Sequence, residues 1–589
     1  MSAATSSSGG KKPLKTFSVE EVEKHNKLGD LWITVDNKVY DLSKFANAHP
    51  GGKHILLDVA GQDATKHFYA FHATAVMEKY HKKLCIGTVE GKEEQIYHPL
   101  DEDEDGATQA TVVEQSGGIS ADKVVPAKMD LKTAPVEQLL KHPLLSRTPF
   151  GEPASLKKFY ATPYFTDSHL RFRLGVREFF HSVLSECDEL EDSQEYVPQE
   201  LWEQFGTSGI FACSIGLVAM PYAKKLNLTL PGGLKPEEFD FFHEQILHEE
   251  SSRMLPPSVS DGIFAGFNIG LTPIINFYHG ADKEELVSSI LLGKKKVCLA
   301  ITGPEAGSDV ANHQTKATVA PDGKHFIVRG LKKWITGGCQ ADYFVTAVRT
   351  GGAGLKGITM LLIKREEGIT TKQLSTSYGK SAATALVQYE DAKVPMEGRI
   401  MAVKKGDGLN KGFQLIMLNF NHERWMIVCK VVGAQRSVIA DCLQWLTQRQ
   451  AFGRPLTDQP VLRFKFGQMA AAMESLQAYL DYVTFQMKTF YDRVRDDPKT
   501  WKTRDYLAGE IGLLKYQATR VSTLIADNGC QLFGGRAVTR TGMGKKMERF
   551  NRIYKISSIY GGSEEIMADL GVRQALREWS PEDKLRAKL

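Results

Sequence analysis

Two histidines near the start of the chain have a spacing suited to binding one metal-containing ring. His49 stands in Asn47-Ala-His-Pro-Gly-Gly52, and His72 follows 23 positions later in Phe68-Tyr-Ala-Phe-His-Ala73. Two imidazoles on opposite faces of a porphyrin give six-coordinate iron, which transfers single electrons rather than binding oxygen. The glycines after His49 let the backbone pass close to such a ring. Taken singly, His49 is better explained as capping a turn and His72 as a surface histidine.

A carboxylate in the last third of the chain is a candidate general base. Glu423, in Asn421-His-Glu-Arg424, lies four residues before the first member of an apolar stripe with helical spacing. A carboxylate in phase with a buried helix face rarely lacks a task or a partner, and desolvation raises its pKa. Adjacent helical residues point about 100° apart, so direct pairing with Arg424 is not expected. A structural ion pair is the alternative. The stripe consists of Ile427, Val431, Ala434, Val438 and Cys442.

Two further segments carry residues suited to a flat, phosphate-bearing cofactor. Residues 298–309 form a turn rich in small and hydroxyl residues after a short apolar strand. Such a turn can bring N–H groups and hydroxyls to a phosphate or to the polar edge of a ring. Residues 330–338 contain Trp334 and Thr336, which would share one face of a strand. A buried core tryptophan is the alternative for Trp334.

The elements that must position these residues differ in periodicity along the chain. An aromatic-rich block is followed by an acidic, apolar-poor stretch around Asp101–Asp105 that cannot offset chain entropy by burial. Helical patterns, then short β-rich runs, then helical patterns again make up the remainder. The predicted parts are a compact domain at 15–92, a flexible linker at 93–145, a helical domain at 146–296, a β domain at 297–405 and a second helical domain at 406–578.

Composition limits the classes of function. The net charge of +4 over 589 residues does not favour nucleic acid as a partner, and no apolar run is long enough to span a membrane. No secretory or mitochondrial signal is visible at the start. The chain ends in Ala587-Lys-Leu589, one conservative change from the Ser-Lys-Leu peroxisomal address. A peroxisomal location is therefore expected, with a cytoplasmic one as the alternative.

The first block resembles the cytochrome b5 family over nearly its whole length. The matching segments occur in the family's order: Phe17–Val22, Asp30–Val35, Val39–Phe45, the His-Pro-Gly-Gly motif, Ala60–Thr65 and Ile86-Gly87. The resemblance implies haem b, with His49 and His72 as axial ligands of the iron. It also implies an electron donor or acceptor protein, which the sequence does not identify.

Five ordered motifs across residues 150–575 resemble the acyl-CoA dehydrogenase family. They are residues 298–309, residues 330–338, Arg449–Leu456, Asp527–Gly535 and Ile559–Ile566. The resemblance implies a multidomain α+β chain, in which the small cytochrome b5-like domain precedes a helical domain, a β-barrel-like domain and a C-terminal helical bundle. It also implies FAD, an acyl-CoA substrate and a homodimer or homotetramer.

The resemblance assigns a role to individual residues. Thr302 and Thr336 would hydrogen-bond the isoalloxazine, with Trp334 against the ring and Ser308 near the pyrophosphate or the thioester. Ser563 would complete the adenine side. The residues that would reach a neighbouring subunit's FAD are Arg449, Phe452, Gln531, Gly534 and Gly535.

One departure from the family bears on catalysis. Many members carry a glutamate base where this chain has Gly561, whereas the isovaleryl-CoA dehydrogenase type places the base on a helix just before an arginine. Glu423 and Arg424 match that second arrangement, so Glu423 is predicted as the base, and Arg424 and Gly561 are expected beside the substrate. Glu564 and Glu565 are weaker candidates.

The expected reaction is FAD-dependent α,β-dehydrogenation of a fatty acyl-CoA or related thioester to the trans-2-enoyl thioester, with the haem domain transferring single electrons. An oxidase that uses oxygen is one alternative. A second, which the loss of glutamate at position 561 keeps open, is a non-enzymatic or repair-associated protein that retains FAD.

Overall fold

The computed structural model describes residues 15–49, 53–65, 67–68, 80–81, 83–91, 129–157, 160–495 and 507–579. His72, residues 93–128 of the expected linker and the C-terminal Ala587-Lys-Leu589 lie outside these residues. The chain divides into two compact units, and the larger holds most of the residues after 120. Among the described helices, none is both long and apolar enough to cross a membrane.

The N-terminal block is a small mixed sheet with short helices. Its strands pair in the order β1-β5-β4-β3-β2, with β1 parallel to β5 and the other pairs antiparallel. Alternate residues of β3, Leu31, Ile33 and Val35, face a core that Leu56 and Ala60 complete. The described elements are β1 (Lys15–Phe17), α1 (Val19–Glu23), β2 (Asn26–Lys27), β3 (Asp30–Val35), β4 (Lys38–Asp41), α2 (Lys53–Leu57) and β5 (Cys85–Val89).

A layer of helices comes before the main sheet in chain order, as the sequence predicts. It begins earlier than expected, because Leu131, Leu139 and Leu145 pack into one cluster with Leu170 and Leu174. Residues 131–145 therefore belong to this domain, and the prediction that they are flexible linker is wrong. The helices are α5 (Val136–Leu139), α6 (Asp167–Ser193), α7 (Gln199–Thr207), α8 (Ile210–Ile215), α9 (Met220–Lys225), α10 (Phe241–Met254), α11 (Pro257–Phe277) and α12 (Lys283–Leu291).

The N-termini of α6 and α10 are joined by paired caps. Thr166 and His169 form a capping box on α6, and Asp240 and His243 form one on α10. The boxes are linked, since His169 Nε2 lies 3.1 Å from Asp240 Oδ1 and Ser168 Oγ lies 3.1 Å from His243 Nε2. Because the caps satisfy backbone donors that a helix leaves free, this link fixes where α6 and α10 begin relative to each other.

The middle domain is a seven-stranded sheet in which β6, β9 and β10 are buried on both faces, whereas β7, β8, β11 and β12 expose residues on one face. Six strands pair in the order β10, β9, β7, β8, β12 and β11, and β6 pairs with β9 in parallel. On β10, Met360 and Leu362 join the core of the helical layer, whereas Leu361 and Ile363 face the other side. The strands are β6 (Val297–Ala300), β7 (Lys316–Val319), β8 (His325–Ile335), β9 (Tyr343–Arg349), β10 (Ile358–Lys364), β11 (Ile369–Gln373) and β12 (Ala385–Pro395).

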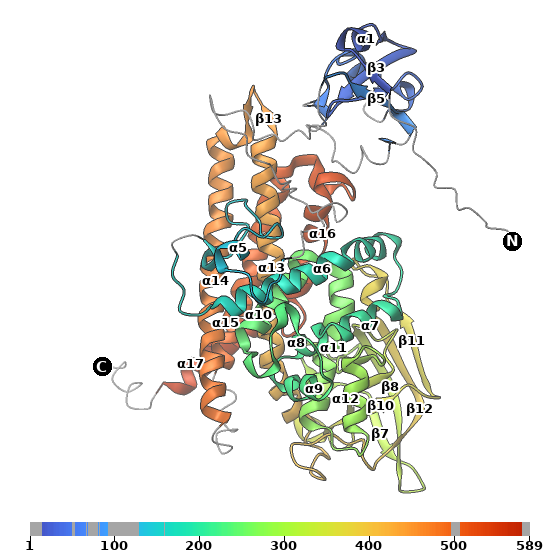
Figure 1. The fold of residues 1–589 in the computed structure, drawn as a ribbon. Helices are drawn as coiled ribbons and strands as arrows, with labels where there is room; N and C mark the ends of the chain where they lie inside the picture. The colour runs from blue at the N-terminus through green and yellow to red at the C-terminus, as the bar shows by residue number, and fades with distance from the viewer. Residues whose placement is uncertain are drawn as a thin grey trace, which may run out of the picture. The chain divides into compact units, whose positions relative to one another are not determined.

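Long helices form the C-terminal part, where α14 and α17 both contact α15 (Figure 1). The predicted stripe of α13 is confirmed: four of its five residues are buried and Ala434 is half-buried. The elements are α13 (Gly412–Gln448), β13 (Gln450–Ala451), β14 (Arg454–Pro455), α14 (Pro460–Arg495), α15 (Ala508–Phe533), α16 (Lys545–Ile553) and α17 (Glu564–Glu578).

A pair of carboxylates, from buried Glu249 and half-buried Asp481, lies where α10 meets α14. Asp481 Oδ1 and Glu249 Oε1 both accept hydrogen bonds from the side-chain amides of Gln245 and Gln477. Burial, and secondarily the nearby charge of Glu249, raises the pKa of Asp481 to about 7. The ionised form is therefore disfavoured in the folded protein, and the free energy of unfolding falls as the pH rises from about 4, the ordinary aspartate pKa, to about 7.

Asp481→Asn keeps the shape and the acceptor oxygen but removes the titration. The variant should raise the free energy of unfolding at pH 8 by on the order of 1–3 kcal/mol more than it does at pH 5. Thermal unfolding at both pH values, followed by circular dichroism, measures the difference. Asp492→Asn, an exposed position on the same helix, is the control. An equal effect of Asp481→Asn at both pH values would contradict the prediction.

Candidate active site

Glu423 lies on α13 in a nearly dry environment. Its side chain is buried, with the residue 8% exposed, and its Oε2 atom has no hydrogen-bond partner among the described residues. Burial raises the pKa of Glu423 to about 7, and the charges of Arg424, Lys515 and His422 oppose that shift. The carboxylate is thus poised to gain or lose a proton near neutral pH, which is what a general base requires.

Gly561 faces the Glu423 carboxylate. A Cβ atom on Gly561 would lie 3.7 Å from Glu423 Oε1 and only 2.6 Å from Ile427 Cδ1. The backbone at Gly561 has φ +66°, which glycine adopts without strain. Glu423 and Gly561 are far apart in the sequence but lie next to each other in the fold. A carboxylate on α13 fills the space in front of the position where many relatives carry their base.

Arg424 hydrogen-bonds the turn at Gly561 rather than the neighbouring Glu423. Its Nε donates to the carbonyl oxygen of Gly561 at 2.9 Å, and its Nη1 donates to Asn421 Oδ1 at 3.2 Å. The guanidinium also lies over the ring of Phe420, 5.3 Å from the centroid. The expectation that Arg424 would not pair directly with Glu423 agrees with these bonds, and Arg424 acts on the carboxylate through its charge.

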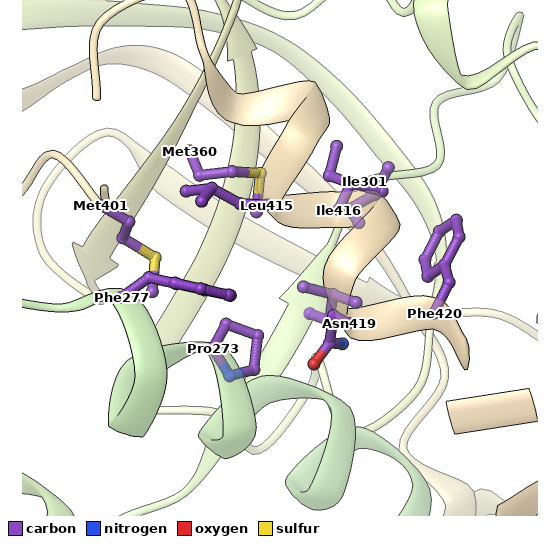
Figure 2. Close-up of a pocket in the computed structure, with 10 residues that line it drawn as sticks. Pro273, Phe277, Ile301, Met360, Met401, Leu415, Ile416, Asn419 and Phe420 are labelled. Atoms are coloured by element: carbon purple, nitrogen blue, oxygen red, sulfur yellow. The ribbon is translucent and has the colours of Figure 1, made fainter. Parts of the chain in front are cut away.

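A narrow apolar pocket lies beside the first turns of α13 (Figure 2). Its open space is about 10 Å³, room for about one water molecule. The wall comes from α11, from the end of β6, from β10 and from α13, one turn before Glu423. The lining residues are Pro273, Phe277, Leu299, Ile301, Met360, Met401, Leu415, Ile416, Asn419 and Phe420.

Asn419, the one amide in this lining, has a structural partner. Pro273 has no N–H group and cannot bond the carbonyl of Ile269 one turn earlier in α11. The Asn419 side-chain amide donates to that carbonyl at 3.4 Å. The bond satisfies a buried acceptor and ties α13 to α11 at the pocket. Sequence reasoning missed Asn419, because 150 positions separate it from Ile269 and only the fold brings them together.

The predicted cofactor loop and the end of β8 lie together. The backbone N–H of Lys333 donates to the carbonyl of Thr302 at 3.0 Å, and Ser308 is exposed on the same loop. Trp334 is 55% exposed, which excludes a core role, and the Lys333 ammonium lies over its ring, 4.7 Å from the centroid. The predicted strand alternation is wrong, because β8 ends at Ile335 and Trp334 has φ +67° at an irregular position. Thr336 follows the strand, with its carbonyl against α11 at Gly266.

The remaining cofactor candidates lie on exposed turns. Phe452 is 95% exposed on the β13–β14 hairpin that Arg449 precedes. Gln531 is exposed on the last turn of α15, and Gly534 and Gly535 follow, with open space at both Cα atoms. These surfaces are available to a group outside the chain. Ser563 is the N-cap of α17, where its hydroxyl accepts from the N–H of Ile566.

His49, the predicted haem ligand that the structure describes, is half-buried after a short 3-10 turn. Its ring meets that of Phe45 edge-on, with the centroids 5.9 Å apart. An aromatic side chain at this distance restricts the rotation of the imidazole. The other predicted ligand, His72, lies outside the described residues.

Gly561→Ala would test whether the glycine is required. The left-handed backbone and the overlap with Ile427 should lower the free energy of unfolding by roughly 1–3 kcal/mol. Thermal unfolding measures this loss. Gly467→Ala is the matched control, because Gly467 has open space within α14 and alanine favours a helix. A Gly561→Ala protein as stable as the parent would show that the turn can rearrange.

Known families match three parts of the chain. The family model of the acyl-CoA dehydrogenase middle domain matches residues 298–392, and that of the C-terminal domain matches residues 410–576. The model of the cytochrome b5-like haem/steroid binding domain matches residues 18–90.

Individual relatives extend these matches. The acyl-CoA dehydrogenase apdG of Emericella nidulans is 33% identical over 448 residues, which cover 75% of this chain and 99% of that protein. The mitochondrial isovaleryl-CoA dehydrogenase of Arabidopsis thaliana is 25% identical, over 70% of this chain and 92% of that protein. The acyl-CoA dehydrogenase of Geobacillus kaustophilus shares the fold, with a TM-score of 0.59 at 24% identity over 70% of this chain and 100% of that one. The chain therefore belongs to the acyl-CoA dehydrogenase family of FAD-dependent oxidoreductases and carries an N-terminal cytochrome b5-like domain.

Proposed function

We propose that the chain removes two hydrogens from the α and β carbons of an acyl-CoA thioester and that Glu423 is the base. The observation that carries this proposal is the buried Oε2 of Glu423, which has no hydrogen-bond partner in the described part of the chain and lies at the point that Gly561 leaves open. A desolvated carboxylate with a pKa near 7 accepts a proton at neutral pH without being paired beforehand.

In the proposed reaction the α-proton passes to Glu423 and the electron pair of that C–H bond forms the new double bond. FAD, when bound, accepts the hydride from the β carbon, so that one proton and one hydride leave the substrate. The residues that would hold FAD fit a planar, phosphate-bearing group. Trp334 offers an exposed aromatic side chain, and the loop from Thr302 to Ser308 offers N–H groups and hydroxyls beside it.

We also propose an apolar acyl tail as the part of the substrate beyond the β carbon. The lining of the pocket beside Glu423 is apolar except for Asn419, whose amide is already used. The present opening admits about one water molecule, so a tail must displace side chains. Met360 and Met401 are suited to this, because an unbranched thioether side chain changes rotamer easily.

For the N-terminal domain we propose haem b held by His49 and His72. The half-buried, ring-restrained His49 fits one axial ligand. Two histidine ligands suit single-electron transfer, and tethering gives the two cofactors of one chain a high effective concentration. Electrons taken from the substrate would then leave through the haem, toward a redox protein that the sequence does not specify.

Glu423→Gln should abolish flavin reduction by substrate while FAD stays bound. Loss of the proton acceptor is expected to slow the reduction by at least about 100-fold. Stopped-flow mixing with a panel of acyl-CoAs, under anaerobic conditions, measures the rate from flavin bleaching. Glu564→Gln, a buried glutamate that follows the same turn, is the matched control and should reduce at nearly the parental rate. Normal bleaching in Glu423→Gln would place the base elsewhere, and no bleaching by any acyl-CoA in the parent protein would favour a non-enzymatic role.

Anaerobic reduction also separates a haem-coupled dehydrogenase from an oxidase. With acyl-CoA and no air, the haem Soret band should shift after the flavin bleaches, because electrons pass to the haem. His49→Ala should remove this shift and leave the bleaching intact. A reduced flavin beside an unchanged haem, followed by rapid bleaching reversal and peroxide formation in air, would instead support the oxidase.

A further inference from the structure

Lys515 is a buried cation that reaches from α15 to the turn carrying Gly561. The residue is 1% exposed. Its Nζ donates to the carbonyl oxygen of Gly562 at 2.6 Å and to that of Ser557 at 3.1 Å. These carbonyls lie on either side of Tyr560 and Gly561, so one ammonium group fastens both ends of the turn.

The same lysine faces Glu423. The position that a Cβ of Gly561 would occupy lies 3.5 Å from Lys515 Cε and 3.7 Å from Glu423 Oε1. Lys515 and Glu423 therefore approach Gly561 from different helices. Because both side chains are buried, the charge of the lysine lowers the pKa of the carboxyl, against the effect of burial.

The other charged groups around Glu423 have partners of their own. On α13, His422 Nε2 lies 2.7 Å from Glu244 Oε1 of α10, and Arg424 is bonded to Gly561. From α17, Glu564 acts on Lys515, and its side chain lies 3.4 Å from Arg520. The phenol of Tyr560 also faces Glu423 from the turn, and burial keeps that phenol neutral by raising its pKa. The Lys515 ammonium bonds only neutral carbonyls in this group.

We propose that Lys515 is a positioning residue for the base: it holds the Tyr560–Gly562 turn open in front of Glu423, and its charge increases the share of that carboxylate that is ionised at neutral pH. This inference rests on the proposed function. Without the lysine, burial would act on Glu423 with less opposition, and a larger share of the enzyme would carry a protonated acid that cannot take the α-proton. The lysine itself stays cationic at neutral pH, since burial lowers its pKa only to about 8.

The test compares Lys515→Met, which removes charge and hydrogen bonds, with Lys515→Gln, which keeps a donor but removes the charge. The rate of flavin reduction by acyl-CoA is measured against pH from 5.5 to 9. Both variants should move the acidic limb of the profile upward by about one pH unit or more, so that the loss is large at pH 7 and small at pH 9. Lys465→Met, which removes a lysine bonded to Asn528 between α14 and α15, should leave the limb in place.

If the acidic limb of the pH profile stays in place in Lys515→Gln, the proposal is overturned. An equal loss of the flavin-reduction rate at every pH would also overturn it, because such a loss indicates a purely structural role. If Lys515→Met fails to fold, the pH profile of Lys515→Gln alone tests the proposal. A second readout needs no turnover: Lys515→Gln should lower the melting temperature more at pH 8 than at pH 5, and this difference should vanish in a Glu423→Gln background. Persistence of the difference in that background would also overturn the proposal. Failure of the proposed function would give a different result, because then no acyl-CoA would bleach the flavin of the parent protein.

Discussion

The desolvation of one carboxylate is the constraint on which the rest of the site depends. An acid oxygen without a hydrogen-bond partner in a dry interior is unfavourable, and Glu423 tolerates it because cations act on it from a distance. Such a balance holds only if the surroundings cannot collapse onto the carboxylate. Gly561 and the bonds from Arg424 and Lys515 to the glycine turn keep that space fixed.

The long helix α13 connects the Glu423 site to the rest of the fold. Its first turns line the apolar pocket, and Asn419 ties it to the carbonyl that Pro273 leaves free in α11. Further along, Gly433 packs so closely on the backbone of α10 that a Cβ would lie 1.9 Å from the carbonyl oxygen of Glu249. The base therefore sits on a helix held at both ends of the site, which limits motion of the carboxylate relative to the pocket.

Buried charge recurs across the helical layers. Arg177 lies within 2.7 Å of carboxylate oxygens of Glu152 and Glu250, and Asp481 and Glu249 share two glutamine amides. Such networks are satisfied only in one arrangement of α6, α10 and α14, since a displaced partner leaves a buried charge unpaired. They provide a rigid frame for the active site, and the raised pKa of Asp481 makes that frame sensitive to pH.

The sequence by itself determined the order of the domains, both family memberships and the helix that carries Glu423. These follow from local signals: period-3.6 stripes on α13, alternating or continuous apolar strands such as β10, and motifs of neighbouring residues. Local signals failed where regular geometry breaks, as at Trp334, whose left-handed backbone ends the strand alternation. They also failed at residues 131–145, where three leucines pack against α6 and polar neighbours hide the pattern. The tertiary structure alone decided which other groups surround the base. Lys515, the Glu244–His422 pair and the bond from Asn419 to Ile269 come together at α13 only because distant helices cross there, and no spacing in the sequence encodes such a crossing.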